Sequence, residues 1–272
     1  HEAAGVVEAV GGEIEALRPG ARVMVYHYYS CGRCRHCLAG YRQLCPKAMG
    51  MAAAGFGSSA EYTLAPEANC LPLPEGLSFA AGAMMACCAA TAFAALRKFD
   101  PAPGARLAIL GMGPVGLCAL LEAQAMGFQT TAIELDPARL AIARQFGAEA
   151  ALDAANTDAM AELRQHARGG GFDCVLETSG AEAARTLAVE ALRPQGKAVL
   201  VGLGPRKPAR FDPYEIVLPE RSVCGSFVFP TFLHEPFADF LLSKGIALDR
   251  VIARRFSLDQ GEEAFRTADT GA

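Results

Sequence analysis

The chain has 272 residues, of which 52% are hydrophobic and 20% are charged, so it is long and apolar enough for one large or two ordinary folded domains and is not a disordered protein. Its net charge of −4 gives no electrostatic case for binding nucleic acid or an anionic membrane, and small polar or neutral ligands fit better. Ten cysteines in a chain of this size indicate metal binding and core packing in a reducing, cytoplasmic setting, not a disulfide framework.

The first 30 residues are expected to form β structure. Valine-rich runs at 4–10 and 22–28 are separated by glycine-containing turns, which is the pattern of short strands joined by tight connections. The chain begins at His1 without a methionine and enters the first of these runs almost at once. We therefore expect it to be a fragment whose upstream portion is absent.

A loop with four cysteines follows the second run. Cys31, Cys34 and Cys37 are each separated by two residues, and Cys45 comes after a further seven. Two-residue gaps let successive thiolates curl around one ion and the fourth closes a tetrahedron, so the loop predicts a structural zinc site. The alternative is an iron–sulfur cluster, but the gap before Cys45 is too long for the ferredoxin pattern. His36 is expected to be solvated, because four cysteines already fill the site.

Residues 50–104 connect this loop to the second half of the chain. We expect a strand at 60–64 and an extended, proline-rich connector at 71–76. The alanine-rich run at 79–98 predicts one helix. Its uncharged part is long enough to touch the membrane-span threshold, but its composition favours a buried helix. The proline- and glycine-rich segment 100–104 ends that helix.

A glycine-rich turn at 111–116 carries the clearest ligand signature. Gly111 permits a sharp turn out of a buried strand, and Gly113 lets the backbone approach a pyrophosphate. Gly116 lets the next helix pack close to the strand, and Pro114 suits the first turn of that helix, whose N-terminus then faces the phosphates. The turn predicts a dinucleotide site; the alternative is a tight strand–helix turn in another doubly wound fold.

Strands and helices alternate from this turn to residue 230. The expected strands are 107–110, 130–134, 150–152, 172–177, 197–202 and 222–229, and the expected helices are 114–126, 137–146, 157–167 and 181–192. Six strands in this alternation predict an α/β fold with a doubly wound parallel sheet of the Rossmann type. Beyond residue 230 we expect a helix at 235–244, a strand near 251–256 and a helix from Leu258.

The order of these motifs resembles the zinc-dependent alcohol dehydrogenase family, the medium-chain dehydrogenases/reductases. The likeness rests on His1-Glu2, the four-cysteine loop, Cys87 and the glycine turn, and it covers essentially the whole chain. It implies a mostly β, GroES-like catalytic domain, incomplete at its start, at 1–88. It also implies an NAD-binding Rossmann domain at 89–225 and a return to the catalytic domain at 226–272.

The resemblance also implies a catalytic zinc. His1-Glu2 matches the family's Gly-His-Glu motif without its glycine, and Cys87 matches a second zinc ligand. Read without the resemblance, Cys87 would be a small buried hydrophobe. The family's first cysteine ligand and its Ser/Thr and His proton relay are not in this sequence. Thr91 is expected under the nicotinamide.

Cofactor contacts follow from the same resemblance. Glu134, at the end of the second Rossmann strand, and Arg139 would hold the adenosine ribose, although Arg139 has a solvated helix position as its alternative. A carboxylate at Glu134 repels a 2′-phosphate, so NAD is favoured over NADP. The remaining expected contacts, each with plain sheet core as the alternative, are Val115, Val201, Gly202, Leu203, Ser226 and Phe227.

His27 is a further candidate in the catalytic domain. The resemblance places the strand before the cysteine loop along the substrate pocket, where a histidine could hydrogen-bond a second hydroxyl of a polyol. The alternative is a structural histidine between Tyr26 and Tyr28.

The function expected from these features is NAD-dependent, zinc-assisted oxidation of an alcohol, possibly a polyol or a secondary alcohol, by a homodimer or homotetramer. The alternative is a truncated or degenerate relative that binds the nucleotide without turnover. A nucleic-acid-binding zinc module is disfavoured by the acidic net charge.

Overall fold

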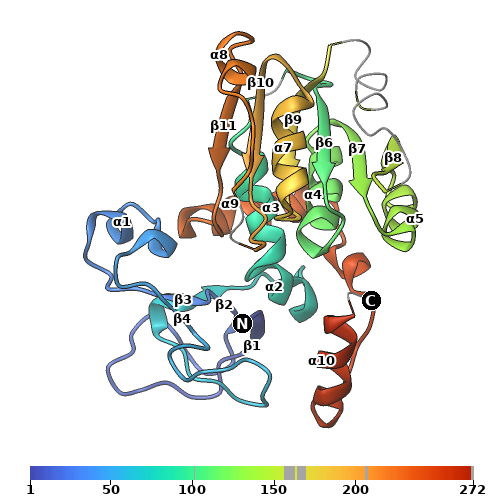
Figure 1. Ribbon diagram of the computed structural model, residues 1–272. Coiled ribbons are helices and arrows are strands. Elements are labelled where there is room, and N and C mark those ends of the chain that lie inside the picture. Colours follow the sequence, from blue (N-terminus) through green and yellow to red (C-terminus); the bar gives the residue numbers. More distant parts are fainter. Residues whose placement is uncertain (101, 156–162, 164–169, 206–207, 271–272) are drawn as a thin grey trace. The chain divides into compact units, whose positions relative to one another are not determined.

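A computed structural model describes residues 1–100, 102–155, 163, 170–205 and 208–270. Two compact units divide the chain, one formed by His1–Ala90 with Val228–Ala272 and the other by Thr91–Phe227. Figure 1 shows the elements of both units coloured along the sequence. The first and last segments of the chain therefore fold together, and the middle of the chain forms a unit of its own.

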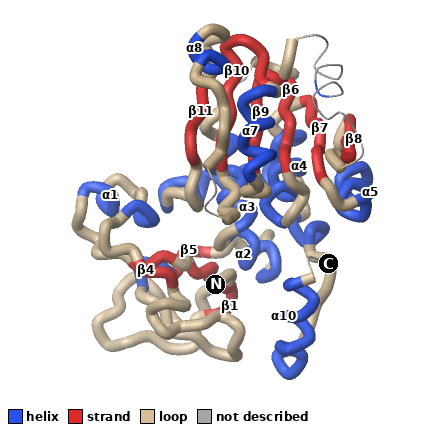
Figure 2. Tube along the Cα trace, in the orientation of Figure 1, coloured by secondary structure: helices blue, strands red, loops and turns tan. Residues whose placement is uncertain are grey.

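The second unit contains a six-stranded sheet in the order β11-β10-β9-β6-β7-β8, and every neighbouring pair is parallel (Figures 1 and 2). This confirms the predicted doubly wound Rossmann sheet. Its strands are β6 Arg106–Leu110, β7 Gln129–Glu134, β8 Ala150–Asp153, β9 Phe172–Glu177, β10 Leu192–Leu200 and β11 Ser222–Gly225.

The chain reverses between β6 and β9 in the strand order, since β7 and β8 lie on one side of β6 and the later strands lie on the other. In an open α/β sheet, ligands bind at the carboxyl ends of the strands at such a switch point. β10 starts at Leu192, where the sequence predicted the end of a helix, and its pairing with β9 shifts register between Leu192 and Lys197. The extra residues bulge there, so the strand is longer than its apolar run.

Helices connect the strands of this sheet. They are α4 Pro114–Ala125, α5 Pro137–Gln145, α7 Glu182–Glu190 and the short α8 Tyr214–Val217. α5 begins as the sequence predicted, because Asp136 caps it by accepting a hydrogen bond from the Ala138 N–H. The helix predicted at 157–167 lies outside the described residues, apart from Leu163.

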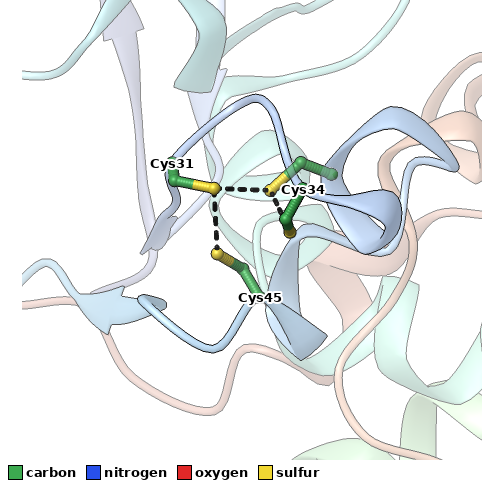
Figure 3. Close-up of side chains that lie close together, drawn as sticks. Cys31, Cys34 and Cys45 are labelled. Atoms are coloured by element: carbon green, nitrogen blue, oxygen red, sulfur yellow. Dashed lines mark hydrogen bonds between the residues drawn. The ribbon is translucent and has the colours of Figure 1, made fainter.

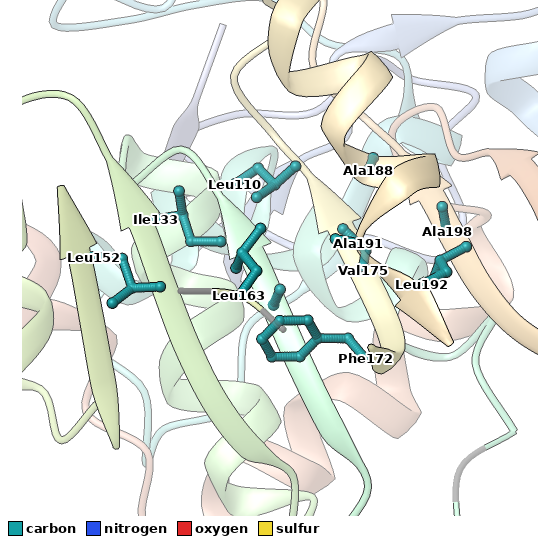
Figure 4. Close-up of a cluster of buried hydrophobic side chains, with 11 residues drawn as sticks. Leu110, Ile133, Leu152, Leu163, Phe172, Val175, Ala188, Ala191, Leu192 and Ala198 are labelled. Carbon is teal, nitrogen blue, oxygen red and sulfur yellow. The ribbon is translucent and has the colours of Figure 1, made fainter. Parts of the chain in front are cut away.

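One apolar cluster fills the space beside the central strands (Figure 4). Leu110 of β6, Ile133 of β7, Leu152 of β8 and Val175 of β9 lie in it, together with Phe172 at the start of β9. Strands covered on both faces are read in the sequence as continuous aliphatic runs, and these strands have that pattern. The cluster holds the strand ends, and so the turns that leave them, in fixed positions.

The first unit contains a three-stranded antiparallel sheet in the order β1-β2-β5 and a two-stranded pair β3-β4. The strands are β1 Ala3–Val6, β2 Arg22–Val25, β3 Tyr28–Tyr29, β4 Met49–Gly50 and β5 Cys70–Pro72. Short helical turns accompany them at α1 Arg35–Leu38, η1 Arg42–Leu44 and η2 Glu67–Asn69. The predicted β structure is present, although each strand is shorter than its valine-rich run.

The predicted strand at 60–64 was wrong. That segment has no strand pairing, and its large side chains Tyr62 and Leu64 are exposed. Gly55, Gly57 and the serines that follow keep the backbone in turns, so the apolar alternation has no neighbouring strand to pack on.

The single helix predicted at 79–98 was also wrong, because the structure divides it into α2 Phe79–Met85 and α3 Cys88–Leu96. Ser78 caps α2 by accepting a hydrogen bond from the Ala81 N–H. The break falls at Ala86 and Cys87, within a run of good helix formers, so tertiary contacts override local propensity at this point. α3 leads from the first unit into the second.

The last segment returns to the first unit through η3 Thr231–Leu233, α9 His234–Lys244, η4 Leu248–Val251, η5 Leu258–Gln260 and α10 Gly261–Asp269. The strand predicted near 251–256 was wrong, since the chain there leaves the turn η4 and Arg254 and Arg255 are exposed without strand pairing. Among the described residues, no single helix combines the length and hydropathy of a membrane span; the bent pair α2 and α3 reaches them only when joined.

Candidate functional site

The four-cysteine loop brings its sulfur atoms together at one point (Figure 3). Cys31 Sγ lies 3.9 Å from Cys37 Sγ and 3.6 Å from Cys45 Sγ, and Cys34 Sγ lies 3.5 Å from Cys37 Sγ. Four sulfurs at about 2.3 Å from one zinc ion would be roughly 3.8 Å apart along the edges of a tetrahedron. The donor set therefore fits a closed, four-thiolate zinc site with no position for a substrate.

Backbone amides favour thiolates in this loop. Hydrogen bonds from the Arg33 and Cys34 amides lower the pKa of the Cys31 thiol to about 6. The pKa of Cys37 is also lowered, because hydrogen bonds from Ser30 and the neighbouring thiols outweigh its burial. Since zinc binds the deprotonated sulfur, these two lowered pKa values favour binding of the ion, whereas burial and hydrogen bonds with the Cys37 and Cys31 thiols raise the pKa of Cys34.

Two residues that the sequence analysis missed fix the base of the loop. Arg42 donates from Nε to Ser30 Oγ at 2.9 Å and from Nη2 to Asn69 Oδ1 at 3.1 Å. The fully buried Asn69 donates to the carbonyl oxygens of Tyr26 and Tyr28. No motif marks these contacts, because they join residues between 12 and 43 positions apart in sequence.

A second group of metal-ligating side chains lies elsewhere in the first unit. Ring nitrogens of His1 and His27 and the Sγ atom of Cys87 all lie within 4.8 Å of one another. His1 Nε2 is 3.3 Å from Cys87 Sγ. A zinc ion with nitrogen ligands near 2.0 Å and a sulfur ligand near 2.3 Å needs neighbouring donors roughly 3.5 Å apart. His1 and Cys87, which the sequence analysis paired, therefore fit one ion.

Burial controls the chemistry of Cys87. Loss of solvent, with the added negative charge of Glu2, raises the pKa of the Cys87 thiol to about 12. The Glu2 carboxyl group hydrogen-bonds Cys87, and its own pKa is raised by burial. Cys87 is thus a weak acid on its own, and a bound cation is the group that would convert it to a thiolate. Glu2 is placed to orient this side chain.

His27 is buried beside the other two donors. Its Nδ1 lies 2.9 Å from the Ala86 carbonyl oxygen, and its ring centroid lies 4.6 Å from that of His1. Burial lowers the pKa of His27, which favours the neutral imidazole. The motifs in the sequence predicted a substrate contact for His27 and did not group it with the metal ligands, because 60 residues separate it from Cys87.

A cavity of about 620 Å³ opens beside this group. His1 lines it together with the loop 52–64 and Phe265 of α10. The hydroxyl-bearing residues Ser58, Ser59 and Thr63 are among those that line it, and the others are largely glycine, alanine and aromatic residues. A small hydroxylated molecule in this cavity would be next to a candidate metal ligand.

The glycine turn of the second unit has the geometry that its sequence predicted. Gly111 has a φ of +96°, a conformation that side chains disfavour. A Cβ atom at Gly116 would overlap the carbonyl oxygen of Gly111, whereas one at Gly113 would meet open space. Thr178, at the end of β9, holds the turn by donating to the Gly111 carbonyl oxygen at 2.8 Å. The contact of Thr178 with the turn was not predicted from the sequence, although the end of that strand was.

Glu134 lies against the same turn. Its Oε2 accepts a hydrogen bond from the Met112 N–H at 2.7 Å, and its Oε1 accepts one from the Leu135 N–H at 2.7 Å. Arg139 lies 4.0 Å from the Glu134 carboxylate and 3.8 Å from that of Asp136. α4 starts beside this carboxylate with Pro114 in its first turn. The ribose assignments of Glu134 and Arg139 stay predictions with a geometry that suits them.

Other predicted cofactor residues are placed as follows. The Val201 and Gly202 amides both donate to the Glu177 carbonyl oxygen, while Leu203 is exposed. The buried hydroxyl of Thr91 has no hydrogen-bonding partner within the described part of the chain, as expected for a group that meets a ligand. Val115, Ser226 and Phe227 lie at the start of α4 and after the end of β11. Their nicotinamide contacts stay predictions.

Comparison with known proteins gives matches along both units. Residues 1–75 match the family model described as an alcohol dehydrogenase GroES-like domain, and residues 114–242 match the one described as a zinc-binding dehydrogenase.

Individual proteins agree with these models. An L-threonine 3-dehydrogenase of Anaeromyxobacter sp. (strain Fw109-5) is 32% identical over 100% of this chain and 78% of its own length. The sorbitol dehydrogenase of Bacillus subtilis (strain 168) is 30% identical over 98% of this chain and 76% of its own. The crystal structure of a zinc-binding dehydrogenase from Sinorhizobium meliloti 1021 bound to NADP superposes with a TM-score of 0.89 at 29% identity, over 97% of this chain and 78% of that one.

Proposed function

We propose that this chain, which belongs to the zinc-dependent alcohol dehydrogenase family, oxidises polyols or other secondary alcohols with NAD. Membership makes it an oxidoreductase that acts on CH–OH donors with zinc and a nicotinamide cofactor. The preference for a polyhydroxylated substrate and for NAD is the part that we infer from this chain's own residues.

The observation that carries the proposal is the cavity beside His1. When bound, zinc supplies a Lewis acid for the alcohol oxygen and the nicotinamide supplies the hydride acceptor. His1 and Cys87 would bind the metal, and Glu2 would hold Cys87 in position. The hydroxyl groups on the cavity wall would then bind the substrate's other hydroxyls and orient the carbon that loses the hydride. The sorbitol dehydrogenase relative supports this class of substrate.

The test is steady-state NAD reduction with a pentitol or hexitol, threonine and a primary alcohol of similar size. We expect kcat/KM to be at least about tenfold higher for the polyol than for the primary alcohol, because each extra satisfied hydrogen bond contributes roughly 1 kcal/mol. Removal of metal by a chelator should abolish turnover. Equal rates for polyol and primary alcohol would remove the polyol proposal.

Thr63 gives a matched pair of variants for this pocket. Thr63→Val keeps the shape of the side chain and removes its hydroxyl, whereas Thr63→Ser keeps the hydroxyl. We expect a several-fold higher KM for the polyol in Thr63→Val, with the primary alcohol unaffected. Thr63→Ser should retain the polyol KM, and a raised KM in both variants would point to loop geometry instead.

The NAD preference rests on Glu134. Its carboxylate lies against the glycine turn through the Met112 N–H, where a 2′-phosphate would be repelled. We expect the unaltered protein to prefer NAD over NADP and Glu134→Gln to narrow this preference about tenfold, as read from the two values of kcat/KM. One solved relative is bound to NADP. If kcat/KM for NAD and kcat/KM for NADP are both unchanged in Glu134→Gln, Glu134 does not set the cofactor preference.

We also infer a homodimer or homotetramer in a reducing, cytoplasmic setting. β11 is an edge strand of the six-stranded sheet, and Tyr214, Val217 and Leu218 expose apolar surface beside it, which is where a second sheet can pair. All ten cysteines are unpaired in the structure. Light scattering of the purified protein tests the assembly, and a monomer at micromolar concentration would contradict it.

A further inference from the structure

Glu177 is a fully buried acidic residue at the end of β9, and none of the predicted cofactor contacts uses it. Its Oε1 accepts hydrogen bonds from the Ser179 hydroxyl at 2.6 Å and from the Gly180 N–H at 2.7 Å. Its backbone carbonyl oxygen accepts from the Val201 N–H at 2.8 Å and from the Gly202 N–H at 3.1 Å. Glu177 therefore holds two segments at once, the turn that leaves β9 and the segment that leaves β10.

These two segments pack backbone against backbone, with glycine at the points of contact. A Cβ atom at Gly202 would overlap the Gly180 nitrogen, and one at Gly204 would overlap the Gly180 carbonyl oxygen. Gly180 itself has a φ of +72°, and a Cβ atom there would overlap the Gly204 nitrogen. Because no side chain fits between the two segments, a shift of Gly180 must move the segment 201–204 as well.

The next residue in the chain holds a different part of the nucleotide site. Thr178 donates from Oγ1 to the Gly111 carbonyl oxygen at 2.8 Å and from its N–H to the Leu110 carbonyl oxygen at 2.9 Å. The glycine turn also packs against Ser179, but these two hydrogen bonds keep it in place independently of the Glu177 carboxylate. Adjacent residues thus support the pyrophosphate turn and the segment 201–203 separately.

The side chain of Glu177 acts through one oxygen. Oε2 is buried and accepts no hydrogen bond from the part of the chain that the structure describes, so the hold on Gly180 depends on Oε1. We propose that Glu177 is a positioning residue for the cofactor. Its carboxylate holds Gly180, and through Gly180 the segment 201–203, in the place where the nicotinamide carboxamide binds.

This inference rests on the proposed function, through the predicted carboxamide contacts of Val201, Gly202 and Leu203, but its test needs no turnover. NADH and ADP-ribose share the adenosine, the pyrophosphate and the second ribose, and only NADH carries the nicotinamide. The Kd of the full chain for each ligand is measured by calorimetry. A change in the ratio of the two Kd values then reports on the nicotinamide half alone.

Glu177→Met keeps the approximate length of the side chain and removes both acceptor oxygens. We expect the Kd of NADH to rise about tenfold, because hydrogen bonds to the carboxamide are lost, and the Kd of ADP-ribose to change by less than about twofold. Glu177→Gln keeps one oxygen for Ser179 and Gly180, so both Kd values should stay within about threefold of those of the unaltered protein. Retained ADP-ribose affinity also shows that the second unit of each variant is folded.

Two further variants make the result specific. Thr178→Val removes the hydrogen bond to Gly111 and should weaken NADH and ADP-ribose by the same factor, because both ligands carry the pyrophosphate. Gly202→Ala disturbs the packing on Gly180 from the other side and leaves Glu177 unaltered. It should weaken NADH about tenfold and spare ADP-ribose, as Glu177→Met does.

Three outcomes overturn the proposal. The first is an equal loss of both ligands in Glu177→Met or Gly202→Ala, the second is an unchanged NADH affinity in either variant, and the third is a loss in Glu177→Gln as large as that in Glu177→Met. If Glu177→Met does not fold, Gly202→Ala decides. Failure of the proposed function would look different, because the variants would give the expected Kd ratios while the unaltered protein oxidised no polyol.

Discussion

The nucleotide site of the second unit and the metal group of the first unit are built in opposite ways. The turn Gly111–Gly116 and Glu134 belong to one stretch of 24 residues, and they act through backbone shape and one carboxylate. The candidate metal group would take its donors from positions 1, 27 and 87 and would act through side chains alone. Contiguous sites are therefore readable as motifs, whereas dispersed sites depend on the packing of separate elements.

The largest expected effect is a loss of kcat/KM when the dispersed metal group is disrupted at Cys87. Cys87→Ser replaces a metal-binding thiolate with a hydroxyl that does not ionise, and the loss of Lewis-acid stabilisation should lower kcat/KM at least about a thousandfold, or roughly 4 kcal/mol. The contiguous site should be untouched, so NADH should bind with unchanged affinity. Zinc content should fall by one per chain.

Cys88→Ser is the matched control for this variant. Cys88 is adjacent and buried; its Sγ donates to the Met84 carbonyl oxygen at 3.6 Å, and it also hydrogen-bonds the Glu2 carboxyl group. It should keep both zinc ions and most activity. Equal losses in the two variants would mean that the helix break, and not the thiolate of Cys87, is what matters.

The second-largest effect is expected from the cysteine loop. This loop is a contiguous metal site, so it can be compared with the dispersed metal group of the same unit. Cys45→Ser should remove one zinc per chain and lower the free energy of unfolding by about 3 kcal/mol, because structural zinc contributes directly to folding. Calorimetry should show a fall in Tm of roughly 5 °C or more. Cys70→Ser, outside the loop, should keep both metals, and an unchanged Tm for Cys45→Ser would deny the loop a structural role.

A third, smaller effect is expected on NADH affinity when the glycine turn of the nucleotide site is altered. Gly116→Ala would force a Cβ onto the Gly111 carbonyl oxygen and displace the turn, so NADH affinity should fall about tenfold, or 1.4 kcal/mol, with both zinc ions retained. Gly113→Ala has space for its Cβ in the protein alone. It should remain as stable as the unaltered protein yet also bind NADH weakly, because the added methyl group would occupy the approach of the pyrophosphate.

The smallest effect is expected on the stability of the second unit, from Asp173 at the strand ends opposite the glycine turn. Burial would raise the pKa of Asp173, but hydrogen bonds from the Arg106 amide and the Arg193 guanidinium outweigh it and hold that pKa below its ordinary value. A depressed carboxyl pKa stabilises the fold above the unfolded pKa near 4, and this stability is lost as pH falls through the folded pKa.

Asp173→Asn should therefore reduce the free energy of unfolding by about 1 kcal/mol or less at pH 7, since the carboxylate is partly solvated. Urea denaturation at pH 7 and at pH 2.5 checks this, and the difference between variant and unaltered protein should vanish at the lower pH. A difference that stayed constant between the two values would assign the effect to packing. NADH affinity should not change.

Spacing and local backbone geometry were enough to predict some features of this protein before the fold was known. The intervals of Cys31, Cys34, Cys37 and Cys45 predicted one ion-sized group of sulfurs, because a short loop with two-residue gaps has few other ways to place them. The alternating aliphatic strands and the glycine turn predicted the parallel sheet and its nucleotide turn for the same reason: each part is specified within about 30 residues.

Features that depend on segments far apart in the chain could not be predicted before the fold was known. Local propensity predicted strands at 60–64 and 251–256, but a strand needs a partner, and none lies beside either segment in the described residues. It predicted an unbroken helix at 79–98, and the contacts of Ala86 and Cys87 with His27 and His1 accompany the break. Because side-chain contacts across 60 or more residues leave no periodic trace in a sequence, His27 became a metal-ligand candidate only once the fold placed it beside the other two donors.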